Sequence, residues 1–108
     1  MNIAFDTKAL RSLSVSRSLA SQKLGKDVAA AFHARLADVD IARNPEELPL
    51  GFITSEESQM EFAIPLVDDY IAIFESNHCI DREAAPGTKT EWSRVNRVKL
   101  VGVVKRND

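Results

Sequence analysis

Residues 60–74 read MEFAIPLVDDYIAIF, and here the pattern of the chain changes from helical to strand-like. Apolar side chains alternate along 60–66, and a second apolar run follows at 70–74. Such alternation is typical of a half-buried strand, because successive side chains point to opposite faces. The acidic pair Asp68-Asp69 between the two runs predicts a tight turn. Together these features predict a β-hairpin with strands at 60–66 and 70–76.

Two further strands are expected outside the hairpin. Residues 96–104 form an apolar run in which Val98, Leu100 and Val104 share one parity, while Lys99 lies on the other. A weaker alternation over residues 2–5 predicts a short opening strand. Pro65 in the first hairpin strand indicates that this strand has a free edge or a bulge nearby.

The N-terminal part of the chain predicts helices over residues 8–24 and 26–42. In the second helix Val28, Phe32, Leu36 and Val39 recur at steps of four, four and three, which is one face of an amphipathic helix. The first helix has an irregular apolar stripe, and we expect it to bend or restart at Ser14-Val15-Ser16. Gly25 separates the two helices, and Asn44-Pro45 opens one extra turn after the second.

This order of elements predicts an α+β fold, with two N-terminal helices packed on one face of a small antiparallel β-sheet. A length of 108 residues corresponds to a single domain spanning 1–108. The expected core residues are Phe32, Leu36, Val39, Phe62, Ile64, Ile73 and Leu100.

Composition and charge narrow the classes of function. The net charge is −2, yet residues 1–44 carry +3, residues 45–87 carry −9 and residues 88–108 carry +4. A protein that coats nucleic acid does not usually contain such an acidic block. Cys79 is the single cysteine, which excludes an internal disulfide and a multi-cysteine zinc site. We expect no cofactor and no metal, no membrane partner, since no apolar run is long enough to span a bilayer, and a cytoplasmic location.

Several strings, spread over nearly the whole chain, resemble one protein family. They are Lys8-Ala9-Leu10, Leu24-Gly25-Lys26, the segment 35–48, Phe62-Ala63-Ile64, the segment 70–75 and Val98-Lys99-Leu100. In this order they resemble the RelE/ParE toxin superfamily, and most closely its HigB-like (plasmid maintenance killer) branch. The resemblance implies a RelE-like fold and the toxin component of a type II toxin–antitoxin system.

For the activity, the resemblance implies a metal-independent, ribosome-dependent mRNA endoribonuclease. Its partners would be a cognate antitoxin protein, the ribosome and mRNA. The alternative is a catalytically silent member that keeps the RelE fold as a protein-binding module. A gyrase-inhibiting, ParE-like toxin is the third interpretation.

The family's catalytic pattern is substituted in this chain. The positions that correspond to its histidine, lysine and arginine before the hairpin are Phe52, Ser55 and Ser58, and the strand arginine is replaced by Ile71. The family's C-terminal Asp-Tyr-His has no counterpart. The polar groups best placed to replace the lost ones are Lys105, Arg106 and Asn107, which are the predicted catalytic residues.

Two groups of cations are candidates for binding. Arg94, Arg97 and Lys99 precede or lie on the last strand and are predicted to bind RNA, with a solvated face that protects a strand edge as the plainer interpretation. The helices carry the predicted partner-binding residues, which are expected to meet acidic residues of an antitoxin: Lys8, Arg11, Arg17 and Lys23.

No catalytic or metal-binding role is predicted for the remaining polar residues or for the tryptophan. His33 is expected to be a solvated residue on the polar side of its helix, and His78-Cys79 to lie in a loop. Glu56, Glu57 and Glu61 are expected to form a solvated acidic face, because they lack the histidine partners of a specific metal site. Trp92 is expected to cap the core near the last strand.

Overall fold

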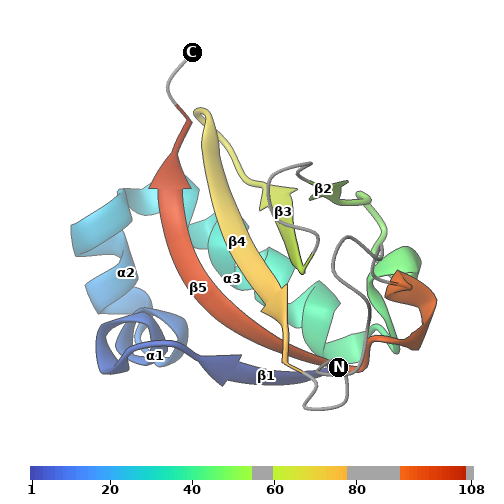
Figure 1. Cartoon of the computed structure of the whole chain (residues 1–108). Coiled ribbons are helices and arrows are strands. Elements are labelled where there is room, and N and C mark those ends of the chain that lie inside the picture. The colour runs from blue at the N-terminus through green and yellow to red at the C-terminus, as the bar shows by residue number, and fades with distance from the viewer. Residues whose placement is uncertain (55–59, 78–90, 107–108) are drawn as a thin grey trace.

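The computed structural model describes residues 1–54, 60–77 and 91–106. Its elements, in chain order, are β1 (Asn2–Phe5), α1 (Lys8–Val15), α2 (Arg17–Leu24), α3 (Lys26–Ile41), the 3₁₀ turn η1 (Pro45–Glu47), β2 (Ile53–Thr54), β3 (Glu61–Pro65), β4 (Tyr70–Ser76), the 3₁₀ turn η3 (Trp92–Arg94) and β5 (Arg97–Lys105). The α+β class is confirmed, and Figure 1 shows α3 behind the curved sheet. None of the described helices is both long enough and apolar enough to cross a bilayer.

The helical part contains three helices rather than the predicted two. Ser16 has an extended backbone with φ −116° and ψ 109°, so it ends α1 and starts α2. Its main-chain nitrogen donates to the Ser12 carbonyl at 3.0 Å, and its Oγ accepts from the Leu19 nitrogen at 3.2 Å. Residues 8–24 therefore form two short helices, and Ser16 caps the C-terminus of α1 and the N-terminus of α2.

Gly25 separates α2 from α3, as predicted. Its φ of +87° lies in the region that residues with a Cβ rarely adopt. This backbone conformation ends α2 and begins α3, and a glycine adopts it without strain.

The five strands form one sheet in the order β1-β5-β4-β3-β2. β2, β3, β4 and β5 pair antiparallel, whereas β1 pairs parallel with β5, with Ile3 opposite Val98 and Phe5 opposite Leu100. The prediction of a purely antiparallel sheet was therefore wrong. Parallel neighbours need a long crossover, and here three helices lie between β1 and the rest of the sheet.

The predicted hairpin is present. Asp68 and Asp69 have φ values of 55° and 65°, the pattern of a type I′ turn, which matches the right-handed twist of the flanking strands. The Tyr70 nitrogen closes the turn by donating to the Val67 carbonyl at 3.0 Å.

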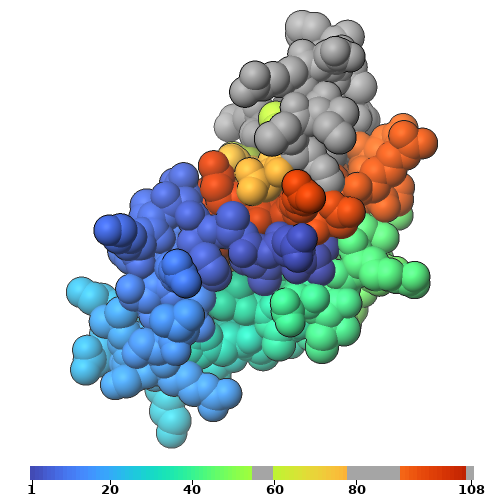
Figure 2. All heavy atoms as spheres, turned by 90° about the horizontal axis from the view of Figure 1, so that it is seen from below, coloured from blue at the N-terminus to red at the C-terminus, as the bar shows by residue number. Residues whose placement is uncertain are grey.

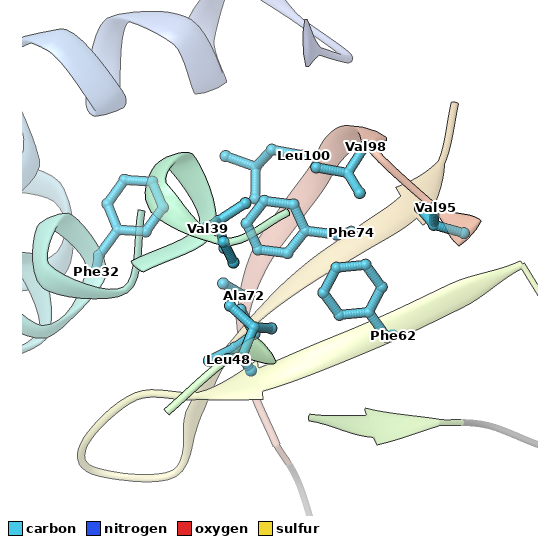
Figure 3. Packing of buried hydrophobic residues seen from close by; sticks show 11 residues of the cluster. Phe32, Val39, Leu48, Phe62, Ala72, Phe74, Val95, Val98 and Leu100 are labelled. Atoms are coloured by element: carbon cyan, nitrogen blue, oxygen red, sulfur yellow. The ribbon is translucent and has the colours of Figure 1, made fainter. Parts of the chain in front are cut away.

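The core lies between α3 and the sheet (Figure 3). The rings of Phe62 and Phe74 stack with centroids 5.3 Å apart, and Phe32 and Val39 of α3 belong to the same cluster. Of the predicted core residues, Phe32, Val39, Phe62, Ile64 and Leu100 are buried. Leu36 is partly buried and packs against the cluster.

Ile73, which was also predicted to be core, lies on the opposite face of the sheet. The residues of β4 that are buried are Ala72, Phe74 and Ser76, so Ile73 has the other parity and is only half-buried. The error arose because residues 71–74 are all apolar, and such a run does not reveal which of its two faces is inside.

A β-bulge in β5 overturns a second parity prediction. Phe74 pairs with Leu100 and Ile73 pairs with Gly102, which leaves Val101 as an extra residue. Beyond the bulge Val103 packs against the core, and Val104 is 44% exposed on the other face.

Candidate functional site

The face of the sheet that points away from α3 carries a polar row at one end. In this row Glu61 of β3 lies opposite Glu75 of β4, and Glu75 lies opposite Lys99 of β5. The Lys99 Nζ is 2.9 Å from a Glu75 carboxylate oxygen and 3.7 Å from a carboxylate oxygen of Asp6, just after β1. The hydrogen bond to Glu75 is the largest cause of a raised pKa at Lys99. The positive charge of this lysine is therefore shared between the carboxylates of Glu75 and Asp6.

The other predicted RNA-binding residues lie near this row. Arg97 is exposed at the start of β5, and its parity places it on the same face as Lys99, as the strand alternation predicted. Arg94 lies in η3 and pairs with Glu91, with an Nε-to-oxygen distance of 3.1 Å. Arg94 and Lys99 therefore lie beside carboxylates, which lowers their attraction for a polyanion.

The rest of this face is apolar. Ile73 lies opposite Ala63 and Gly102, and one step further Ile71 lies opposite Pro65 and Val104. The cross-strand neighbours of Ile71, the residue predicted to replace a family arginine, carry no charge.

The predicted catalytic residues lie at the far end of β5. Lys105 is exposed opposite Tyr70, and the main-chain nitrogen of Arg106 donates to the Asp69 carbonyl at 2.7 Å. Asn107 lies outside the described residues. Lys105 lies eight residues after Arg97, at the opposite end of β5, a rise of at most about 26 Å at ~3.3 Å per residue. Arg97 and Lys105 therefore do not converge on one phosphate.

Phe52, which was predicted to replace a family histidine, packs against the core. Its ring lies edge-on to those of Phe62 and Trp92, with centroid distances of 5.5 and 5.8 Å. Trp92 also packs edge-on against Phe62 at 5.2 Å, which confirms that the tryptophan covers the core near β5. Ser55 and Ser58 lie outside the described residues.

His33 is not the solvated residue that its place in the sequence suggested. It is half-buried, and its Nε2 is 2.9 Å from the Leu13 carbonyl, which ties α3 to α1. His78, Cys79, Glu56 and Glu57 fall in the segments that the structure leaves undescribed. Across the described ranges, no cluster of three or more potential metal ligands occurs.

The predicted partner-binding cations form an exposed basic surface on α1 and α2. It consists of Lys8 and Arg11 on α1 and Arg17 and Lys23 on α2. Within the described part of the chain, none of these four forms an ion pair. We call these four residues the basic helical surface.

A hollow of about 480 Å³ adjoins this surface where β1 leads into α1. It is lined by Ile3, Ala4, Phe5, Asp6, Thr7, Lys8 and Arg11. No pattern in the sequence predicts this hollow, because it adjoins the edge strand β1, and β1 takes that place only by pairing with β5.

No protein-family model matches this chain, and neither a curated protein nor a solved structure matches it.

Proposed function

We propose that this chain is a toxin-like protein of a type II toxin–antitoxin pair that works by binding protein rather than by cutting RNA. The observation that carries this proposal is the basic helical surface. Its four cations are exposed and without carboxylate partners in the described residues, so their charge is available to an acidic partner.

The sheet offers less support for RNA cleavage. That reaction needs a group to take the proton of the 2′-hydroxyl, a group to protonate the leaving oxygen, and cations aimed at the phosphate. On the polar row the Lys99 charge is shared between Glu75 and Asp6, and Glu61 adds a third carboxylate opposite Glu75. Polyanionic RNA is repelled by such a grouping more than it is attracted.

The antitoxin is the partner that the family resemblance implies. An antitoxin segment rich in Asp and Glu is complementary to Lys8, Arg11, Arg17 and Lys23, and long-range attraction between such surfaces speeds their encounter. The predicted RNA-cleaving activity would instead depend on Lys105 and Arg106, which lie at the opposite end of β5 from Arg97.

The test is induced expression in bacteria, with growth and the 5′ ends of ribosome-bound mRNA followed together. We expect no codon-phased cleavage. In parallel, the products of flanking genes are co-expressed, and we expect one of them to bind the chain in a salt-dependent way.

Codon-phased cleavage that disappears in a folded Lys105→Ala, Arg106→Ala double variant would overturn the proposal in favour of a ribonuclease. The matched control is a Lys26→Ala, Arg43→Ala double variant, which also removes two exposed cations but at positions outside β5 that are not predicted to bind RNA.

A further inference from the structure

We propose that the free edge of β1 binds an extended, acidic segment of a partner protein, which adds a strand to the sheet. This inference rests on the proposed function, because it names the chemistry and the place by which the partner is held.

The first support is the position of β1. The sheet order places it at one edge, paired on a single side with β5. Figure 2, which views the molecule from below, shows the start of the chain (darkest blue) at the surface beside the helices. Edge strands present a row of main-chain groups with which another chain can pair.

The second support is the direction of the β1 main chain. Asn2 donates to the Asn96 carbonyl at 2.9 Å and Asp6 donates to the Leu100 carbonyl at 3.0 Å, so the even-numbered residues face β5. By the alternation of a strand, the N–H and C=O groups of Ile3 and Phe5 point to the free edge. Among the described turns, loops and side chains, none hydrogen-bonds to these groups.

The third support is that β1 lacks the features that usually prevent an edge strand from pairing with another chain. Its four residues, Asn2 to Phe5, include no lysine and no proline, and its register with β5 is continuous. Lysine, proline and bulges are the usual devices that keep an edge from pairing. A strand added here would also follow an existing mode of peptide recognition, in which main-chain bonds give affinity and side-chain pockets give specificity.

The charge of the occupant follows from the hollow at the end of β1. Lys8 and Arg11 line it, and neither has a carboxylate partner in the described residues. Asp6, the one acid of the lining, is within 3.7 Å of the Lys99 Nζ and so is already partly compensated. The first turn of α1 has no acidic residue. A carboxylate entering the hollow therefore meets two exposed cations and the positive end of a helix.

The experiment is an amide NMR titration of the full chain with a short capped peptide of alternating Val and Glu at low salt. Two matched peptides are used beside it: one in which Lys replaces Glu, and one in which alternate peptide nitrogens are methylated on the bonding edge. We expect the acidic peptide to shift the amides of Ile3 and Phe5 and to slow their exchange. The other two peptides should do neither.

Charge-reversal variants test the role of the hollow. We expect Lys8→Glu with Arg11→Glu to weaken binding of the acidic peptide by about tenfold. The matched control, Lys105→Glu with Arg106→Glu, makes the same change in net charge at exposed residues at the far end of β5, outside the basic helical surface, and should change binding by less than about twofold. Equal weakening by both pairs would overturn the assignment to the hollow.

Three other results would also overturn the proposal. They are unchanged Ile3 and Phe5 amides with the acidic peptide, equal binding of the lysine or methylated peptide, and self-association of the chain through β1, which would make a second copy the occupant. The first two are read on the unsubstituted chain, so they stand even if a variant fails to fold. If the co-expressed partner still binds the chain while the acidic peptide leaves the β1 amides unchanged, only this inference fails. If β1 binds the acidic peptide while mRNA is cleaved, only the proposed function fails.

Discussion

Lys99 on β5 lies directly opposite Glu75 on β4, and the Lys99 Nζ is 2.9 Å from a Glu75 carboxylate oxygen. Glu75 also lies directly opposite Glu61 of β3, so two like charges oppose each other on one face of the sheet. The cation that was predicted to bind RNA therefore has a role within the sheet. Its charge offsets the repulsion between carboxylates and ties β4 to β5.

This pair predicts how stability depends on alkaline pH. The pKa of Lys99 is raised above its ordinary value of 10.5, first by its hydrogen bond to Glu75. A cation with a raised folded-state pKa contributes stability that is complete below pH 10.5 and is lost as the pH rises through the raised value. In Glu75→Gln the pKa of Lys99 should fall back towards 10.5. The measurement is an NMR titration of the lysine side chain, together with urea unfolding across that range.

The control for this titration is Glu61→Gln, which removes a carboxylate from the same face without removing a contact of Lys99. It should leave the pKa of Lys99 raised. The interpretation would fail if both variants lowered that pKa equally.

Two adjacent residues of β4 test which face of the sheet is inside. Phe74 is fully buried, so Phe74→Ala should cost about 3–5 kcal/mol of unfolding free energy. Ile73 is half-buried on the other face, and Ile73→Ala should cost clearly less. Chemical denaturation of both variants measures the difference, and a larger loss at Ile73 would contradict the register.

Three glycines predict opposite effects of the same substitution. Gly25 and Gly51 have φ of +87° and +72°, so alanine there should destabilise the chain by about 1 kcal/mol, even though no atom lies within 4 Å of the added Cβ. At Gly102 the added Cβ makes an ordinary 3.8 Å contact with Val104, and φ is not in the left-handed region. Gly102→Ala should therefore stabilise by about 0.4–1 kcal/mol, because it restricts the unfolded chain. Thermal unfolding of the three variants checks the sign at each position.

The basic helical surface predicts the kinetics of partner association. Replacing Arg11 and Arg17 by Glu should slow association with the co-expressed antitoxin and weaken its salt dependence, because both residues are exposed and unpaired in the described chain. Stopped-flow or surface-based kinetics at several salt concentrations measures both effects. Lys105→Glu with Arg106→Glu is the charge-matched control, and an equal slowing in that variant would remove the assignment to the helices.

Much of the candidate site was predictable where it depends on local pattern. The four cations of the basic helical surface lie on helices predicted from the N-terminal sequence, and they are exposed as expected for charged residues there. The state of Lys99 was not predictable, because Asp6 and Glu75 approach it only through strand pairing. For the same reason, the helical pattern does not reveal that His33 lies 2.9 Å from the Leu13 carbonyl, a contact between α3 and α1.

Three features were predictable because their signals are local: the amphipathic α3, the hairpin with its acidic turn, and the glycine between α2 and α3. In each case a few neighbouring residues set the backbone conformation through periodicity or allowed dihedral angles. Tertiary structure alone decided that β1 pairs parallel with β5, that Val101 bulges so that Val103 rather than Val104 reaches the core, and that β1 becomes a free edge beside Lys8 and Arg11. These features depend on contacts between segments far apart in the chain. The buried area and the hydrogen bonds that such contacts gain depend on both segments, so the pattern of one segment does not predict them.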